Sequence, residues 1–337
     1  PGTDAAFQNT MINHIIVNKL YDEDYVVTHT NALFLSDEAF DFKDGVFSGY
    51  DAEHHKYDTK TWGYQLDGKG KPRVAKSLND PHCVFTRLKT FVSRYTLEMG
   101  EQITGIPAAQ IQQIAETMAK NRPGAILYAL GMTQHTTGVQ GIRSFTILQL
   151  LLGNIGKPGS GVNALRGEPN VQGACDMGVL YNYMPGYLNS PTNAEPTIYH
   201  YVRKNGIADS RYLVNMLKAS FGDAATKEND YAYAWLPKRD AVKDYGTMPM
   251  FEDALAGKLK MLWIVGQNPA VTVPNLKLTF DAMANLETLV VQEIWETETA
   301  AFWKRPGADP TSINTEVILL PAAFFMEKNG TISNSGG

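Results

Sequence analysis

Short apolar runs alternate with helical segments along much of this chain, and this alternation limits the folds open to it more than any other feature. The runs cover residues 126–131, 260–266, 288–292 and 316–321. Buried parallel strands have this continuous apolar character, and a helix between two strands returns the chain in the same direction. The alternation therefore predicts an α/β fold with a doubly wound, mostly parallel sheet, which is the Rossmann-like arrangement.

Two helices are predicted in the first third of the chain. One starts at Thr3 and Asp4 and ends near Lys19. The other has Pro107 in its first turn, where a missing backbone N–H is tolerated. Apolar residues follow at helical spacing and predict a buried face, formed by Ile111, Ile114, Ala115 and Met118.

Two long stretches lack sustained periodicity and are predicted to be insertions. Residues 37–80 are rich in Asp, Gly, Lys and Tyr, with a hairpin expected around 64–74. Residues 179–250 are aromatic, irregular and partly helical. We therefore expect residues 1–122 to be the end of one domain and residues 123–337 to form the Rossmann-like domain, each with its insertion.

The composition argues against several classes of protein. A formal net charge of -5 without a basic stripe argues against a nucleic-acid partner. No apolar run approaches the roughly 18 residues that a membrane-spanning helix needs. The two cysteines, Cys83 and Cys175, form no Cys-x-x-Cys pair, so an iron–sulfur cluster or structural zinc within this chain alone is not expected. Cys175 is predicted to be a small packed residue.

Polar turns directly follow three of the predicted strands, at the ends where ligands bind in an open parallel sheet. These turns are residues 131–135, 266–269 and 292–297. Thr133, Gln134 and the amides of the next helix start suit a phosphate, whereas Asn268 and Glu293 suit a guanine or ribose edge. Each turn by itself is equally typical of an ordinary strand-to-helix connection. The Gly-x-Gly-x-x-Gly and Walker A fingerprints are absent, which disfavours a nicotinamide site.

Residues 165–178, Leu-Arg-Gly-Glu-Pro-Asn-Val-Gln-Gly-Ala-Cys-Asp-Met-Gly, suit neither a helix nor a strand. A glycine-rich loop of this kind is costly to order unless something binds it. Its arginine, Arg166, presents a planar fork that matches a carboxylate and stays charged. An isolated arginine is most often a surface or ion-paired residue, but within this loop an anion-binding role is favoured.

This loop resembles the one beneath the metal–pterin cofactor of molybdenum- and tungsten-dependent formate dehydrogenases, in the molybdopterin oxidoreductase superfamily. The similarity extends over nearly the whole chain and is specific to the catalytic (alpha) subunit of the respiratory, periplasmic type. It is carried by residues 1–4, 45–53, 91–96, 128–136, 150–156, 185–188 and 323–334. The chain thus resembles an internal fragment of that subunit, with both ends inside a longer protein.

The resemblance implies that the complete enzyme oxidises formate to carbon dioxide, or runs the reverse, with Arg166 facing the substrate. The implied cofactor is molybdenum or tungsten held by two molybdopterin guanine dinucleotides. By the resemblance, residues 1–122 are the end of one molybdopterin-binding domain, and residues 123–337 are the Rossmann-like domain that binds the pterin–guanine dinucleotide. The implied cofactor contacts are Gly2, Thr3, Asp4, Gly131, Thr133, Gln134, His135, Gly167, Asn170, Gln172, Gly173, Gly266, Asn268, Pro269, Thr272, Gln292, Glu293 and Thr297.

Other parts of the family's machinery are outside this chain. The cysteines of a [4Fe-4S] cluster and the selenocysteine-or-cysteine and histidine pair at the metal are missing, so the chain alone is not expected to turn over formate. The resemblance implies an iron–sulfur beta subunit as partner, allows a membrane cytochrome b subunit, and places the enzyme in the periplasm for anaerobic respiration. Two alternatives stay open: an oxidoreductase of the same superfamily acting on nitrate or another oxyanion, and a non-catalytic cofactor-binding module of a split enzyme.

Overall fold

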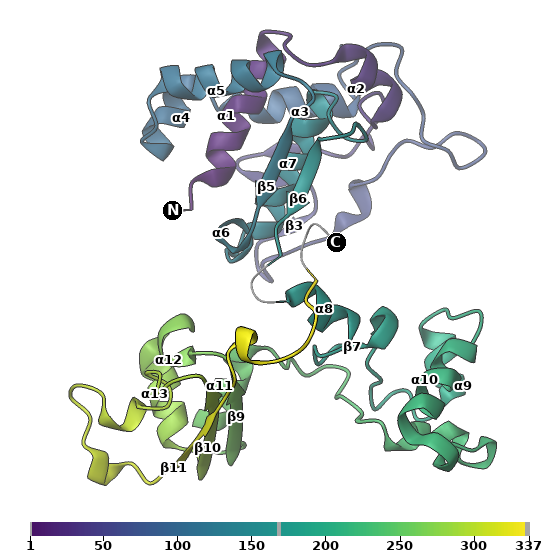
Figure 1. The fold of residues 1–337 in the computed structure, drawn as a ribbon. Helices are drawn as coiled ribbons and strands as arrows, with labels where there is room; N and C mark the ends of the chain where they lie inside the picture. The colour runs from purple at the N-terminus through teal and green to yellow at the C-terminus, as the bar shows by residue number, and fades with distance from the viewer. Residues whose placement is uncertain (1, 167–169, 334–337) are drawn as a thin grey trace. The chain divides into compact units, whose positions relative to one another are not determined.

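The structure, a computed structural model, describes residues 2–166 and 170–333. It has a mixed α/β architecture with several small sheets, which confirms the predicted class. Its contacts divide the chain into two units, Pro1–Gly167 and Glu168–Gly337. Figure 1 shows the helices and strands of each unit.

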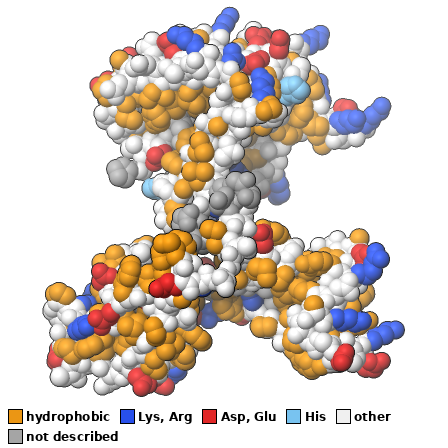
Figure 2. Space-filling view, viewed as in Figure 1, with side chains coloured by type: hydrophobic (Ala, Val, Ile, Leu, Met, Phe, Trp, Pro, Cys, Tyr) orange, Lys and Arg blue, Asp and Glu red, His pale blue; other side chains and the backbone are white. Residues whose placement is uncertain are grey.

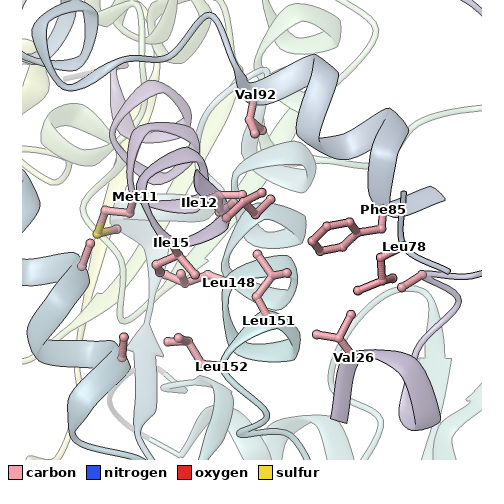
Figure 3. Close-up of a cluster of buried hydrophobic side chains, with 14 of the residues drawn as sticks. Met11, Ile12, Ile15, Val26, Leu78, Phe85, Val92, Leu148, Leu151 and Leu152 are labelled. Atoms are coloured by element: carbon pink, nitrogen blue, oxygen red, sulfur yellow. The ribbon is translucent and has the colours of Figure 1, made fainter. Parts of the chain in front are cut away.

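The first unit is mainly helical. Its helices are α1 (Asp4–Val17), α2 (Glu23–His29), α3 (Val84–Val92), α4 (Leu97–Thr104), α5 (Ala108–Lys120), α6 (Leu130–Thr133) and α7 (Gly138–Leu151). Their shared core contains the fully buried side chains of Ile12 and Ile15 from α1, Ile111 from α5 and Leu148 from α7. Figure 3 shows Ile12 and Ile15 among the leucines of α7, so α1 and α7 pack against each other in this core.

Two parallel strands complete this part of the first unit: β5 (Ala125–Tyr128) pairs with β6 (Gly161–Ala164). Among the described residues β5 pairs with β6, and the single doubly wound sheet that we predicted across all of the apolar runs stays a prediction. Helix α7 connects β5 to β6 and buries Leu148 against α1, so the β5–α7–β6 segment packs within the first unit. The contacts divide the chain after Gly167, and the domain boundary that we predicted after residue 122 stays a prediction.

The stretch at 37–80 is an irregular part of the first unit, as predicted. Its elements are β1 (Phe42–Lys43), β2 (Val46–Phe47), β3 (Tyr50–Asp51), β4 (Lys56–Tyr57) and η1 (Thr59–Thr61). The expected hairpin around 64–74 is confirmed, because Leu66 bridges Pro72 in antiparallel register and the Arg73 amide donates to the Gln65 carbonyl. We call residues 37–80 the insertion.

The second unit contains a three-stranded parallel sheet in the order β11-β10-β9. Its strands and the helices beside them are β9 (Met261–Val265), β10 (Thr288–Glu293), β11 (Glu316–Pro321), α11 (Thr247–Leu255), α12 (Pro269–Thr272) and α13 (Leu276–Ala284). The three apolar runs and the helix near 275–285 are therefore confirmed. Leu262 and Ile264 pack into the core that α11 and α13 cover, whereas Trp263 on the opposite face is 58% exposed. The second helical layer of a doubly wound sheet is not seen in the part of the chain that the structure describes.

A separate hydrophobic cluster forms within residues 171–236. Its elements are α8 (Val171–Asp176), β7 (Tyr183–Met184), η2 (Pro185–Tyr187), β8 (Leu188–Asn189), α9 (Ile198–Lys204), α10 (Arg211–Phe221), η3 (Gly222–Ala224) and η4 (Lys227–Trp235). Tyr201, Leu213, Leu217 and Tyr233 are its almost fully buried members. Helix α8 corrects the expectation that residues 165–178 contain no helix. The short 3-10 segments η5 (Phe302–Lys304), η6 (Pro310–Ser312) and η7 (Phe325–Glu327) follow later.

Charged side chains of both signs lie on the surface. On the faces visible in Figure 2, lysine and arginine side chains are interspersed with acidic ones. Across residues 2–166 and 170–333, the helices are all too short or too polar to span a bilayer.

Glu195 is a buried acid inside the cluster at 171–236. Its side chain is 4% exposed, and its carboxylate accepts from the Thr192 amide at 2.6 Å and lies 2.9 Å from the Lys204 ammonium. Burial opposes ionisation, but the hydrogen bonds from Lys204 and Thr192 outweigh it, so the pKa of Glu195 is below its ordinary value. The pKa of the nearby Tyr201 hydroxyl is raised to about 12, first by burial and then by the negative charge of Glu195.

We expect this cluster to lose stability as acid protonates Glu195. A carboxyl whose pKa is lowered by folding stabilises the folded state above its ordinary pKa of 4.5, and this contribution is lost as the pH falls through the lower folded value. The urea midpoint, followed by tryptophan fluorescence from about pH 6 down to about pH 3, should fall more steeply for the native chain than for Glu195→Gln. Parallel pH profiles for the two proteins would contradict this assignment.

Candidate functional site

The carboxyl ends of β5 and β6 bring two of the predicted site segments together. Tyr128 and Ala164 are register partners at the ends of these strands, and the Leu165 amide donates to the Tyr128 carbonyl at 2.8 Å. Arg166 therefore leaves β6 at the same sheet edge at which α6 leaves β5. Its side chain is exposed and engaged in an interaction within the structure.

The start of α1 lies at the same end of the first unit. The Ser144 hydroxyl in the middle of α7 donates to the side chain of Gln8 on α1, and the Asp22 amide, a few residues past α1, donates to the Leu151 carbonyl at the end of α7. The two helices thus run in the same direction and start together (Figure 1). Gly2, Thr3 and Asp4 precede or open α1, and the Thr3 side chain makes no capping hydrogen bond to the helix.

The turn after β5 is held by its own hydrogen bonds. His135 Nε2 lies 2.8 Å from the Gly131 carbonyl oxygen, so the imidazole hydrogen-bonds back to helix α6. Helix α7 then starts at Gly138, where an added Cβ would lie 2.5 Å from the Thr133 carbonyl oxygen; only glycine allows that approach. Gly131, Thr133, Gln134 and His135 are all exposed beside these contacts.

The second group of predicted residues lies at the carboxyl edge of the β11-β10-β9 sheet. Gly266, Asn268, Pro269 and Thr272 follow β9, whereas Gln292 and Glu293 end β10 and Thr297 lies in the turn after it. The Gly266 amide donates to the Gln292 carbonyl at 3.0 Å, which ties the two turns together. This edge therefore assembles the seven residues predicted from the two turns.

Asn268 connects these turns through its side chain. Its Oδ1 accepts from the Thr299 hydroxyl at 2.7 Å and from the Thr299 amide, and its Nδ2 donates to Glu298 at 2.6 Å. The Glu298 carboxyl has a lowered pKa, first because of its own backbone amide and then because of Asn268. The Asn268 side chain, which we predicted to contact a guanine or ribose, thus holds the turn through these hydrogen bonds. Thr299 positions Asn268, and no sequence pattern predicted this role. A buried threonine after a strand has no sequence pattern that distinguishes it.

Within the glycine-rich loop, residues 171–176 form the short helix α8, and the residue before this helix has a left-handed backbone. Gly167 lies outside the described residues. Asn170 has a left-handed φ of 59° and its Oδ1 accepts from the Ser333 amide at 3.0 Å. An added Cβ on Gly173 would lie 2.1 Å from that same Oδ1, so glycine is required for this arrangement. Cys175 is buried, as expected of a packed residue.

A model of the molybdopterin oxidoreductase family matches residues 1–337. The chain belongs to the molybdopterin oxidoreductase family. It is 44% identical to formate dehydrogenase 2 subunit alpha (cytochrome c-553) of Nitratidesulfovibrio vulgaris, over 99% of this chain and 35% of the relative. It is 41% identical to formate dehydrogenase subunit alpha of Megalodesulfovibrio gigas (99% and 34%) and 40% identical to the nitrate-inducible formate dehydrogenase major subunit of Escherichia coli (99% and 35%). The chain spans about a third of the length of these curated relatives.

Two orphaned polar atoms fit the pterin cofactor that this family's name implies. Gln172 Oε1 and Thr297 Oγ1 are buried and have no hydrogen-bond partner among the described residues. A buried oxygen without a partner is costly, and a ligand that supplies a donor or an acceptor removes that cost. A pterin carries ring nitrogens, an amino group and a carbonyl, so the residues present fit such a group. No cluster of three or more His, Cys, Asp or Glu side chains that could hold a metal occurs within 2–166 and 170–333.

Proposed function

We propose that this chain is part of the catalytic subunit of a formate dehydrogenase, which oxidises formate to carbon dioxide or reduces carbon dioxide to formate. The supporting observation is the place of Arg166: it leaves β6 beside the turn after β5, in a chain 40–44% identical to formate dehydrogenase subunits over 99% of its length. Formate is a small anion with two oxygens. A guanidinium fork matches both oxygens, so Arg166 orients the carboxylate.

The proposed cofactor is molybdenum or tungsten with two molybdopterin guanine dinucleotides. When bound, it supplies the two-electron redox chemistry that no side chain of this chain provides. The turn at Gly131–His135, with Gly2, Thr3 and Asp4 near the start of α1, would hold one part of it through amides and hydroxyls. Gln172 and Thr297 would complete their hydrogen bonding on it. The remaining predicted contacts in the loop and at the second sheet edge stay proposals of the same kind, and the full sheet is proposed to be doubly wound.

The partners follow from the same assignment. We propose that the complete subunit holds a [4Fe-4S] cluster and a selenocysteine or cysteine metal ligand in segments outside this chain, and delivers electrons to an iron–sulfur beta subunit. A membrane cytochrome b subunit would be the next acceptor, with the enzyme in the periplasm. The relatives named above support the subunit arrangement through the words "subunit alpha" and "major subunit" in their names.

A substrate panel on the complete, metal-loaded enzyme tests this function. Dye-coupled assays would measure oxidation of formate, and reduction of carbon dioxide, nitrate and arsenate, with the same preparation. We expect turnover with the formate and carbon dioxide pair alone. Faster turnover of nitrate or arsenate would assign the chain to an oxyanion reductase, and binding of the pterin without any turnover would assign it to a non-catalytic module.

A further inference from the structure

A cavity of about 660 Å³ opens in the first unit between α3 and the insertion. Its size falls within the roughly 300–1,000 Å³ of typical small-molecule sites. Six aromatic side chains line it: Phe40, Phe42, Phe47, Trp62, Tyr64 and Phe91. None of the predicted cofactor contacts is among its lining residues, so the cavity is not explained by the proposed function.

The rings of this cavity form a continuous wall. Phe47 stacks on Phe91 with centroids 6.0 Å apart and an interplanar angle of 17°, and it meets Trp62 edge-on at 5.5 Å. Phe42 contacts both Phe47 and Phe91, at 4.9 and 5.1 Å. Such a wall offers ring faces and edges to a flat ligand, and aromatic pairs favour these offset and edge-to-face contacts.

Two arginines border the same cavity. The Arg94 guanidinium lies 4.4 Å from the ring centroids of both Phe42 and Phe91, and its Nε donates to the Phe91 carbonyl. Arg87 also lines the cavity and contacts Ser36, His82 and the Phe40 ring. Neither guanidinium has a carboxylate within ion-pair distance in the described ranges; Asp41 also lines the cavity but pairs with neither.

We propose that this cavity binds a planar aromatic molecule that carries one carboxylate. The aromatic wall supplies the apolar contact, and the two guanidinium groups without an acidic partner supply the charge that a carboxylate complements. Arg94 is already held between two rings, so little side-chain freedom is lost when the anion binds. The charge on the wall selects an anion over a neutral ring of the same shape.

Equilibrium dialysis of the complete enzyme with radiolabelled 2-naphthoate tests this site, with the neutral isostere 2-naphthamide as the matched probe. We expect saturable binding of the naphthoate and about tenfold weaker binding of the amide, the loss typical of one charge-assisted hydrogen bond. Equal affinity for the two probes would overturn the proposal. So would the absence of saturable naphthoate binding, which would mean that another part of the complete protein fills the cavity.

Two variants locate the binding. Arg94→Gln removes a cavity charge and should weaken naphthoate binding by about tenfold. Lys89→Gln removes an equal charge from an exposed position of α3, the helix just before Arg94, outside the lining, and should leave naphthoate binding unchanged. Formate turnover should be the same in both variants, which shows that each enzyme is folded. Identical naphthoate binding by the two variants would place the ligand elsewhere and overturn the proposal.

Discussion

Replacing Arg166 with alanine in the complete enzyme is expected to lower formate turnover by at least about a hundredfold, the order of loss seen when one positioned donor to a reacting anion is removed. Metal and pterin content should stay at the level of the native enzyme. The reason is geometric: Arg166 is at the edge of the β5–β6 sheet, with its side chain exposed, and none of the buried core depends on it. Steady-state kinetics with metal and guanine analysis of the same preparation would measure both quantities.

Two further arginine variants separate charge from shape. Arg166→Lys keeps the positive charge but loses the bidentate fork, so we expect turnover between that of the native enzyme and that of Arg166→Ala. Arg73→Ala removes an exposed arginine of the insertion whose side chain donates a hydrogen bond to Gln65, and it should keep full turnover. If Arg166→Ala turned over formate as fast as Arg73→Ala, the substrate-binding role would be wrong.

Local patterns predicted the elements of this fold better than their assembly. The apolar runs at 260–266, 288–292 and 316–321 became β9, β10 and β11, because short apolar runs of this length, bounded by turn signals, favour strands. Residues 126–128 of the run at 126–131 also became part of a strand, which pairs with residues 161–164, whereas Leu130 and Gly131 lie in helix α6. That partner is short and contains Asn163, so it carries no strand signal. Which strands share a sheet depended on how α7 packs against α1, and no local pattern contains that information.

The candidate site shows the same limit. Proximity to a predicted strand end placed the Gly131–His135 turn at the edge where β5 ends. Arg166 lies at the same edge because the parallel strand β6, which no local pattern predicted, ends beside β5. Side-chain partners were not predictable: Asn268 is of a suitable type for a nucleotide edge, yet its amide is bound to Thr299 and Glu298. Residues 171–176 are helical although Gly173 lies among them. The Asn170 carbonyl accepts a hydrogen bond from the Ala174 amide, and the side chain of Asn170 lies close against Gly173, so these contacts fix the first turn of the helix.

Replacing Ile111 with alanine is expected to lower the free energy of unfolding of the first unit by about 2–5 kcal/mol, the usual cost of such a truncation in a packed core. Ile111 lies on α5 with no exposed surface, in the cluster that includes Ile12 and Leu148. Urea unfolding of the chain, followed by far-ultraviolet circular dichroism, would measure the change in midpoint.

Ile114→Ala is the matched control, because it deletes the same atoms three residues further along α5. The helical spacing predicted both isoleucines to be buried, but Ile114 is 40% exposed. Partial exposure leaves less apolar surface to lose and lets neighbouring side chains and water fill the space, so the expected loss is about 1 kcal/mol or less. A smaller loss than for Ile111 would show that only one side of α5 is in the core. Equal losses would instead show that Ile114 is covered in solution, and that the pattern in the sequence reports a second buried contact of α5.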